Sequence, residues 1–388
     1  MKKRLLLLLL AVVAFLCSCE RRDMEYYYRA TCGVVLNTDW SNFPETPTGM
    51  SVYFYRSGDV APIVYTTADI ATTTIELPAG HYRAFLISQS PEEFWTYNFM
   101  SMTDFSNANV SLATTRSRWY VSKGLDRNSF DPSAVALEPE DLGAAVIDEF
   151  DITKEMVELY QANYADWKTK TKTKTKTKTK AGDTKAGDTR SPDEIAREAL
   201  DASIMTINAT PYNIVSHMIV RVYIDNIYNL YSARASISGM SSGYIFSRMI
   251  TAEETTVQLF DSELWTKHID EEDPTRGYIE GHIRTLGLPG SQARGLTSRA
   301  PELNMFALSC LLVDGTTQRD FDFLVGDKFT VDLGVSGINL QLNMEVGTDL
   351  LPEVELPDVE PAGGGGGSGG MDAVVLNWEE GETIEISM

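Results

Sequence analysis

Long stretches of this chain alternate apolar and polar residues with a period of two. The clearest is 338–346, where Ile, Leu, Leu, Met and Val alternate with Asn, Gln, Asn and Glu. Residues 212–224 and 50–55 follow the same pattern, and residues 305–313 form a nearly continuous apolar run. Strict alternation predicts half-buried strands, and a short continuous run predicts a central strand covered on both faces. We therefore predict a mainly β chain with one buried face on each alternating strand.

Turn residues separate the predicted strands and indicate how they pair. Pro44, the segment 46–49 (TPTG) and the segment 78–80 (PAG) each lie between two strands. Short strands separated by such turns are typical of antiparallel β-sandwiches. We predict an N-terminal β-sandwich over residues 29–150 and a C-terminal β-sandwich over residues 202–388.

The C-terminal sandwich is predicted to contain a flexible linker. Residues 363–370 are seven glycines and one serine, a composition that behaves as a flexible chain. The segment after it, residues 371–388, resembles a strand and could pair within its own sheet or with a neighbouring chain.

Residues 151–201 differ from both blocks and are predicted to form a helical pair. The first helix is expected from the near-helical spacing of apolar residues in 151–167, and the second from a capping box in which Ser191 precedes Pro192 and Glu194. Between them, residues 168–190 hold nine basic residues and two acidic ones, and lysine alternates with threonine up to residue 180. A run of like charges with little to bury predicts a disordered Lys/Thr-rich loop over 168–190.

The N-terminus has the pattern of a bacterial lipoprotein signal. Three basic residues precede a 12-residue apolar stretch, which is too short to cross a bilayer that needs roughly 20 residues. The sequence Leu-Cys-Ser-Cys then ends at Cys19, which fits the acylated residue of a lipobox. We predict a signal peptide over residues 1–18, lipid attachment at Cys19 and a charged tether over residues 19–28. An ordinary secretory signal with incidental cysteines is the alternative.

Charge and cysteine content exclude several classes of protein. The formal charge of the chain is −22, and removal of the three basic residues of the signal peptide makes it −25. Such an acidic surface repels phosphate backbones, so no nucleic-acid partner is expected. Four cysteines do not form a disulfide-rich scaffold in a chain of this length, and Cys32 and Cys310 are predicted to be buried thiols inside strands.

The candidates for catalysis and metal binding are weak. Ser241 lies in a G-x-S-x-G sequence, but this motif activates a serine only at a strand-to-helix turn, and here strands are predicted on both sides. The histidines, which include His81, His217 and His282, do not occur at metal-ligand spacing. Residues 270–273 (DEED) lack the spaced ligands of a calcium loop and are read as a solvated acidic loop. A pair of carboxylates distant in sequence, as in glycoside hydrolases, stays open.

Several short segments together resemble the fimbrial anchor and accessory lipoproteins of Bacteroides-type bacteria. The segments that carry the resemblance are 39–41 (DWS), 47–55 (PTGMSVYFY), 77–82 (LPAGHY), 235–240 (ASISGM), 285–288 (TLGL), 314–316 (DGT) and the glycine run before 371–372 (MD) and 378–379 (WE). The resemblance covers nearly all of residues 19–388 except the Lys/Thr insertion. Leu286, where an aromatic residue is more usual, is a second departure.

The resemblance implies the fold and the biological role. It implies two transthyretin-like antiparallel β-sandwich domains, a lipid-anchored outer-membrane location exposed at the cell surface, and a structural subunit that anchors or caps a fimbrium and supports cell adhesion. The implied partners are fimbrial shaft or accessory subunits and the outer membrane itself. The family has no catalytic residues, so no enzyme activity, cofactor or metal is expected. The alternative is a surface lipoprotein that binds glycans or host ligands, with Trp95, Trp119 and Trp265 as candidate stacking platforms.

Overall fold

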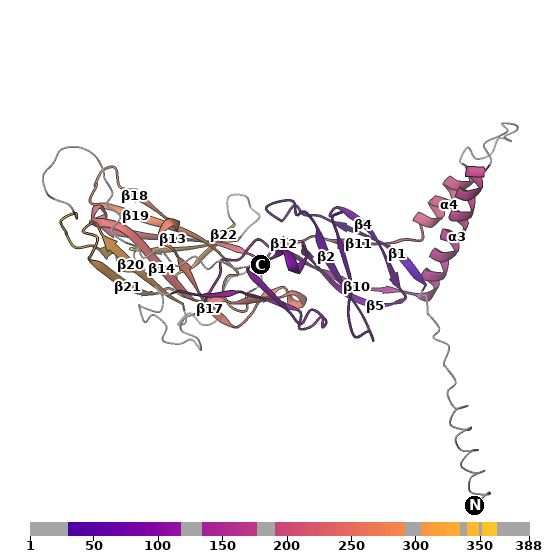
Figure 1. Cartoon of the computed structure of the whole chain (residues 1–388), viewed down its shortest axis with the longest axis horizontal. Coiled ribbons are helices and arrows are strands. Elements are labelled where there is room, and N and C mark those ends of the chain that lie inside the picture. The colour runs from indigo at the N-terminus through magenta and orange to yellow at the C-terminus, as the bar shows by residue number, and fades with distance from the viewer. Residues whose placement is uncertain are drawn as a thin grey trace, which may run out of the picture. The chain divides into compact units, whose positions relative to one another are not determined.

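The computed structural model describes residues 30–117, 134–176, 191–291, 304–333, 340–348 and 351–362 (Figure 1). The predicted signal peptide, Cys19, the tether, the linker 363–370 and the segment 371–388 lie outside the described residues, as does Trp119.

Strands dominate the described residues, which confirms the prediction of a mainly β chain. The strands are β1 (Thr31–Thr38), β2 (Met50–Arg56), β3 (Ile63–Thr67), β4 (Thr72–Pro78), β5 (Gly80–Ser88), β6 (Tyr97–Met100), β7 (Asn109–Leu112), β8 (Thr114–Arg116), β9 (Ala134–Ala136), β10 (Gly143–Ile152), β11 (Met205–Ala209), β12 (Tyr212–Asn213), β13 (Ser216–Asp225), β14 (Leu230–Ser241), β15 (Gly243–Ile245), β16 (Ile250–Thr251), β17 (Thr255–Phe260), β18 (Trp265–Ile269), β19 (Arg276–Thr285), β20 (Met305–Leu312), β21 (Gln318–Leu324), β22 (Thr330–Leu333), β23 (Leu340–Val346) and β24 (Val354–Glu355). The helices are α3 (Lys154–Lys176), α4 (Pro192–Asp201) and the short 3-10 turns η1 (Pro91–Glu93), η2 (Ile227–Asn229), η3 (Phe246–Arg248) and η4 (Ser262–Leu264).

The chain divides into two compact units. Unit 1 consists of Met1–Val35, Thr74–His81 and Asp151–Thr206, and unit 2 consists of Leu36–Thr73, Tyr82–Phe150 and Ile207–Met388. The domain limits predicted from the sequence stay a prediction, and the two units are described separately below.

Unit 1 contains the predicted helical pair. Helices α3 and α4 lie side by side (Figure 1), and the amide of Asn163 donates to the carbonyl of Ala199 at 3.0 Å. Helix α4 begins with the predicted capping box, formed by Ser191 and Glu194. The start of β1 packs on α3, because the amide of Gln161 donates to the carbonyl oxygen of Thr31 at 2.7 Å.

The prediction of a disordered loop over 168–190 is wrong for its first part. Helix α3 continues to Lys176, so residues 168–176 are helical, whereas residues 177–190 lie outside the described residues. Lysine is a good helix former. A local ion pair supports the helix here, since Lys170 pairs with Asp166, one turn earlier, at 2.7 Å.

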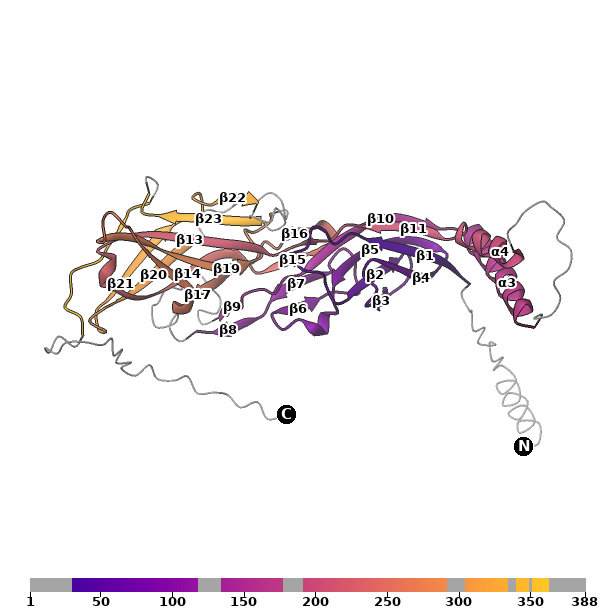
Figure 2. The ribbon, with the colours of Figure 1, turned by 90° about the horizontal axis from the view of Figure 1, so that it is seen from above.

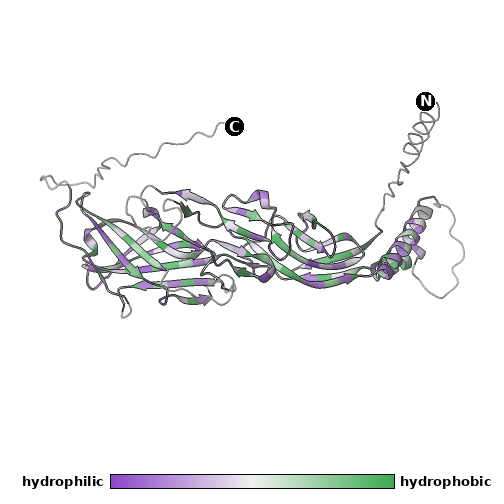
Figure 3. Ribbon diagram, turned by 90° about the horizontal axis from the view of Figure 1, so that it is seen from below, coloured by the Kyte–Doolittle hydropathy of each residue, from purple (hydrophilic) through white to green (hydrophobic). Residues whose placement is uncertain are grey.

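Unit 2 contains a two-layer sandwich made from the C-terminal half of the chain. One layer is the sheet β18-β19-β13-β23-β22, with β24 also paired to β13, and the other is the sheet β17-β14-β20-β21. Apolar residues of both sheets form one core, with Met218, Val220 and Leu342 from the first and Ile237 and Phe306 from the second. Figure 3 shows hydrophobic and hydrophilic residues alternating along many strands, the pattern from which the strands were predicted.

The pairing in this sandwich is not antiparallel throughout. Strand β13 pairs antiparallel with β19, from Ser216↔Thr285 to Asp225↔Arg276. On its other side β13 pairs parallel with β23, and further along parallel with β24. The alternation of side chains has the same period in parallel and antiparallel strands, so the sequence pattern does not reveal strand direction.

A second core of unit 2 combines residues that are far apart in the sequence. Strands β15 and β16 join β7 and β6 in a four-stranded sheet, through pairs such as Tyr244↔Val110 (Figure 2). The core under this sheet contains Tyr53 and Phe85 of the sheet β12-β10-β5-β2-β3 together with Tyr244 and Phe246. Strands from the second strand-rich block therefore complete a sandwich of the first block.

The prediction of one buried face per alternating strand is wrong for β2. Met50, Val52 and Phe54 are fully buried on one face, but Tyr53 and Tyr55 on the opposite face are also less than 10% exposed. Tyr53 stacks on Phe85 at a centroid distance of 5.1 Å. The prediction of a single buried face left Tyr53 and Tyr55 on an exposed face. In the structure, the aromatic core under β15 and β7 covers that face.

Candidate functional site

Ser241 is a structural residue and not an exposed nucleophile. It is fully buried at the end of β14, and β15 follows after one residue, so the motif lies between two strands. Its hydroxyl lies 2.9 Å from the carbonyl oxygen of Ala252 and 3.0 Å from that of Gly243. Gly239 has a φ of +73° in the irregular part of β14, where the register with β17 shifts. Gly239 therefore accommodates a bulge, and Gly243 allows the close approach of β7, because a Cβ on it would lie 2.5 Å from the carbonyl oxygen of Val110.

The histidines are dispersed over the surface of the described residues. His81 contacts Asp151 at 2.9 Å and His282 contacts Glu280 at 2.8 Å, while His268 stacks on Tyr278 with a centroid distance of 4.6 Å. Across the described part of the chain, no three His, Cys, Asp or Glu side chains are grouped as metal ligands.

The acidic residues 270–273 bind their own backbone. The carboxylate of Asp270 accepts the amides of Glu272 and Asp273, and the carboxylate of Asp273 accepts the amide and hydroxyl of Thr275. The hydrogen bonds from Thr275 lower the pKa of Asp273. The segment is a self-capped acidic turn at the end of β18, as expected of a solvated loop.

Cys32 and Cys310 are free and buried, as predicted. Burial raises the pKa of the Cys32 thiol. Burial, together with the charge of Asp320, raises the pKa of the Cys310 thiol to about 12. Neither thiol forms a reactive thiolate near neutral pH, because the thiolate and not the thiol is the nucleophile.

Trp95 and Trp265, the two described tryptophans proposed as stacking platforms, differ in their exposure to solvent. Trp265 packs on the core of the C-terminal sandwich, 5.4 Å from Phe260 and 6.4 Å from Phe306 between ring centroids. Trp95, in contrast, is 85% exposed. Of these two rings, that of Trp95 is the one open to contact with a ligand or partner.

The backbone at Trp95 is hydrogen-bonded to the side chain of Glu140, which is 45 residues away in the sequence. One carboxylate oxygen of Glu140 accepts three hydrogen bonds, from the amides of Trp95 and Thr96 at 2.9 and 3.1 Å and from the hydroxyl of Thr96 at 3.0 Å. The hydroxyl of Tyr97 donates to the carbonyl of Glu140 at 2.5 Å. The ring of Trp95 is thus presented by backbone that has few alternative conformations.

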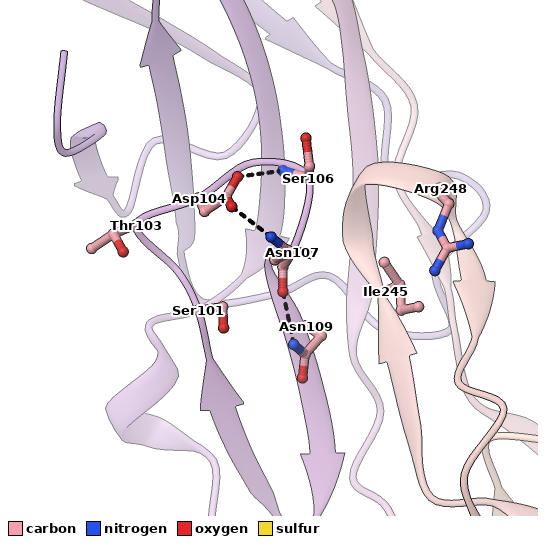
Figure 4. A pocket seen from close by; sticks show the side chains of 8 residues that line it. All are labelled: Ser101, Thr103, Asp104, Ser106, Asn107, Asn109, Ile245 and Arg248. Carbon is pink, nitrogen blue, oxygen red and sulfur yellow. Dashed lines mark hydrogen bonds between the residues drawn. The ribbon is translucent and has the colours of Figure 1, made fainter. Parts of the chain in front are cut away.

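A polar hollow of about 400 Å³ lies where two distant segments of unit 2 meet (Figure 4). The lining residues are Ser101, Thr103, Asp104, Ser106, Asn107, Asn109, Ile245 and Arg248. The segment between β6 and β7 is shaped by Asp104, whose carboxylate accepts the amide of Ser106 at 3.0 Å and the side-chain amide of Asn107 at 2.6 Å. The hydroxyl of Ser247 donates to the carbonyl of Ser106 at 3.1 Å and joins the two segments.

Arg248 supplies positive charge at the edge of this hollow. Its side chain is exposed, and it takes part in none of the ion pairs formed within the described residues. A guanidinium beside hydroxyl and amide groups suits a carboxylated or hydroxyl-rich ligand, because it can donate several hydrogen bonds in one plane. The hollow can bind a small polar ligand, but it contains no arrangement of nucleophile and base.

The outer face of the sheet formed by β13, β19 and β23 carries a second polar cluster. Arg221 contacts Glu280 at 2.5 Å and Glu345 at 3.6 Å, and its guanidinium lies 5.9 Å from the ring centroid of Tyr278. Burial acts to raise the pKa of Glu280, but hydrogen bonds from Arg221 and His282 outweigh it and lower that pKa. A hollow of about 380 Å³ lies beside Arg221 on this face.

Sequence analysis did not identify Arg248, Asp104, Glu140 or Arg221 as site residues. Each is an ordinary polar residue in a loop or on a wet strand face, with no neighbour in the sequence that marks it. The partners of Glu140 and Arg221 are more than 40 residues away, at Trp95 and Glu280. Asp104 binds the nearby Ser106 and Asn107, but the segment that carries Arg248 is distant in the sequence. Only Trp95 carried a signal, its aromatic ring.

A comparison with known protein families identifies one family that matches most of the chain. The sequence model of a family described as "Domain of unknown function (DUF5119)" matches residues 18–261. No functionally curated protein matches the chain in sequence.

One solved structure shares the fold at low sequence identity, and others align less closely. A Bacteroides ovatus protein described as a candidate adhesin is 12% identical, with a TM-score of 0.51, over 88% of this chain and 98% of that one. The fimbrial anchor protein Mfa2 of Porphyromonas gingivalis is 10% identical, with a TM-score of 0.42, over 81% and 90% of the two chains. The tip fimbrial protein Mfa3 of the same organism is 9% identical, with a TM-score of 0.29, over 76% and 78%. The Bacteroides ovatus structure supports the β-sandwich fold that the sequence resemblance implied.

Proposed function

The chain belongs to the family described as domain of unknown function (DUF5119), and from this premise we propose that it is a lipid-anchored structural subunit of a surface fimbrium. It would anchor or cap the fibre at the outer membrane and support cell adhesion. The observation that carries the proposal is the fold shared with the Bacteroides ovatus candidate adhesin, of which this chain covers 98%. A non-enzymatic role accords with Ser241, whose hydroxyl is buried and hydrogen-bonded.

Attachment to the membrane is proposed to depend on Cys19. This cysteine ends the lipobox, and acyl chains on its thiol and amine would exceed the two lipid signals that stable anchoring needs. Within the part of the chain that the structure describes, neither helix combines the length and the apolar character needed to span a bilayer.

Fibre subunits are proposed to bind at a free sheet edge of the C-terminal sandwich. Strand β21 is the last strand of the sheet β17-β14-β20-β21, and within the described residues no further strand pairs with its outer edge. An edge of this kind can accept a strand from another chain. Leu324 at its end is 60% exposed, which gives an incoming strand an apolar contact. The segment 371–388, which is strand-like in sequence, is a second candidate for contact with a neighbouring subunit.

The anchor is tested by replacing the acceptor thiol. Cys19→Ala should lose incorporation of labelled palmitate and leave the membrane fraction. Cys17→Ala is the matched control, because it removes a cysteine two residues away and should keep both label and location. A Cys19→Ala protein that stays labelled and membrane-bound would refute the anchor.

The fibre role is tested in cells that make fimbriae. A photo-crosslinker at Leu324 should capture a fimbrial subunit, whereas one at Tyr231, which is 56% exposed on the interior strand β14 of the same sheet, should not. Deletion of the protein should release fibres into the medium. Fibres that remain attached without the protein, together with no captured subunit, would leave only the alternative below.

The alternative is binding of glycans or host ligands at the surface, and the hollow beside Arg248 favours it. Its hydroxyl, amide and guanidinium groups suit a sugar that carries a carboxylate. Arg248→Ala should abolish binding of such a sugar on a glycan array, while Arg319→Ala, an exposed arginine on β21, should not. An array without any bound glycan would remove this alternative.

A further inference from the structure

A polar groove follows β23 on the outer face of the C-terminal sandwich. Its floor consists of the side chains of Gln341, Asn343 and Glu345, which alternate with buried residues of the same strand. Strand β23 lies between β13 and β22 (Figure 2), so Arg221 of β13 and Thr330 of β22 form the two walls. The volume of this hollow is about 380 Å³. We call it the β23 groove.

The charges in the β23 groove compensate one another. Arg221 is opposite Glu280 of β19 on one side and Glu345 of β23 on the other, and it forms ion pairs with both. Lys328, which also lines the groove, pairs with Asp327 at 2.9 Å. Opposite charges that face each other across strands stabilise the sheet. Two cations and three carboxylates leave almost no net charge, so the groove does not select an ionic ligand.

The groups on the floor and walls both donate and accept hydrogen bonds. The side-chain amide of Gln341 donates to the side-chain oxygen of Asn343 at 2.6 Å, which fixes the two amides relative to each other. The carbonyl oxygen of Gln341 and the amide nitrogen of Asn343 then point the opposite capacities toward a ligand, and the hydroxyl of Thr330 offers both. A ligand hydroxyl also donates and accepts. The groove is therefore suited to a ligand that carries many hydroxyl groups.

The position of the groove disfavours an extended peptide as the ligand. Strand β23 pairs with β13 over residues 341–346 and with β22 over residues 340–343, so the groove lies on a face of the sheet and not at an open edge. A peptide can add to a sheet as a strand only at an edge. On a face it would need pockets for apolar side chains, and among the described lining residues Ile219 is the one apolar side chain that is not fully buried.

We propose that the β23 groove binds a neutral oligosaccharide, whose hydroxyl groups form hydrogen bonds with Gln341, Asn343, Glu345 and Thr330. The floor residues repeat along the strand and span about 13 Å from Gln341 to Glu345, which suits an extended chain of sugars. The groove shares no described lining residue with the hollow beside Arg248, which suits a sugar with a carboxylate. The proposal does not depend on the fibre role, because a fibre subunit or a separate surface lipoprotein could carry this site.

The first test measures binding of the mature full-length chain to immobilised neutral and acidic oligosaccharides. The chain is purified with Cys19→Ser, so that no acyl group is present. We expect binding to neutral oligosaccharides, and we expect added salt to leave it unchanged, because salt screens only interactions between charges. Absence of binding to every neutral oligosaccharide, or neutral binding that falls with salt, would overturn the proposal.

The second test removes the two amides of the floor. Gln341→Ala with Asn343→Ala should weaken binding of the neutral oligosaccharide by about 30-fold, because the loss of one neutral hydrogen bond weakens binding by about fivefold. Asn98→Ala, at an exposed asparagine of β6, is the matched control and should leave the affinity unchanged. The same affinity in the double variant and the wild type would place the ligand elsewhere and overturn the proposal.

A blocking variant tests the groove without removing a group from its floor. Thr330 is exposed on the wall, so Thr330→Tyr should fill the groove and abolish binding, while tyrosine keeps a high strand propensity. Thr266→Tyr is the matched control, because Thr266 is exposed on the same face opposite Glu280. Strand β18, which carries it, is four strands from β22, or about 19 Å. Binding that survives Thr330→Tyr, or equal loss in both variants, would contradict the assignment.

Two further outcomes separate this proposal from the others. A photo-crosslinker at Thr330 that captures a fimbrial subunit in cells, when the purified chain binds no neutral oligosaccharide, would identify a protein as the occupant and overturn the proposal. Attachment of fibres is read independently in the deletion strain. Oligosaccharide binding with fibres that stay attached without the protein would refute the fibre role alone, and released fibres without oligosaccharide binding would refute the β23 groove alone.

Discussion

Glu140 should be worth far more to stability than an ordinary surface acid. One of its carboxylate oxygens accepts three hydrogen bonds from Trp95 and Thr96, at 2.9, 3.0 and 3.1 Å. Hydrogen bonds to a charged group are worth about 1.5–3 kcal/mol each when they are buried, and only part of that when water can replace the partner. Trp95 is exposed, so its amide can bind water after the change, whereas the part-buried groups of Thr96 are less easily hydrated.

We therefore expect Glu140→Ala to lower the free energy of unfolding by about 2–3 kcal/mol, with Thr96 supplying most of the loss. Urea denaturation measures it, and an unchanged slope would show that the unfolded state is unaltered. Amide exchange at Trp95 and Thr96 should become faster, because both amides lose their acceptor. Glu140→Gln keeps an acceptor oxygen without the charge and should lie between Glu140→Ala and the wild type.

Glu45→Ala is the matched control. Glu45 is an exposed acid for which the structure gives no hydrogen bond or ion pair, so the same change of charge and size should alter stability by less than about 0.5 kcal/mol. The reasoning is refuted if Glu140→Ala changes stability as little as Glu45→Ala and leaves the exchange of the Thr96 amide unchanged.

Three further predictions test other parts of the fold. Ser241→Ala should lower the free energy of unfolding by about 1–2 kcal/mol, because the buried carbonyl oxygen of Ala252 loses the hydroxyl that donates to it, and a fluorophosphonate probe should label neither form; labelling that Ser241→Ala abolishes would make the protein a hydrolase. Gly33→Ala should cost about 1–3 kcal/mol in thermal or urea unfolding, because the new Cβ would lie 2.7 Å from the Tyr160 ring, and an unchanged midpoint would contradict this packing. Hydrogen bonds from Thr317 and Thr316 lower the pKa of Asp314 to about 2, so its stabilisation is complete above its ordinary pKa and is lost as the pH falls through about 2. Asp314→Asn should accordingly be less stable than the wild type near neutral pH, and the difference should shrink as the pH falls and disappear below pH 2; a stability difference independent of pH would contradict this assignment.

The alternation of apolar and polar residues was enough to predict many of the strands. Residues 338–346 were predicted as a half-buried strand, and β23 covers Leu340–Val346 with Leu342, Met344 and Val346 buried. The capping box at Ser191 predicted the start of α4. These signals are local, because the period of two and the caps of a helix depend only on neighbouring residues.

The local sequence pattern gave wrong predictions where neighbouring structure determined whether a segment is helical or buried. Alternating lysine and threonine predicted a loop, yet residues 168–176 continue α3, which is already formed by the preceding residues. Extending an existing helix requires only one further residue to be ordered at each step, so a segment in which lysine, a good helix former, alternates with threonine can follow it. Likewise, Tyr53 and Tyr55 alternate with the buried residues of β2, which predicted an exposed face, but they lie in an aromatic core.

By itself the sequence determined the class of the fold, the helical pair and the buried thiols, and it provided the basis for proposing Cys19 as the lipid site. The tertiary structure alone decided which strands pair, and so it alone joined β15 to β7, placed β23 parallel to β13, brought Arg248 to the hollow beside Asp104 and fastened Trp95 to Glu140. The physical reason is that strand propensity and burial are properties of a residue and its neighbours. Pairing partners, strand direction and convergent polar groups instead depend on which surfaces far apart in the chain fit together, and an alternating pattern is the same for every partner.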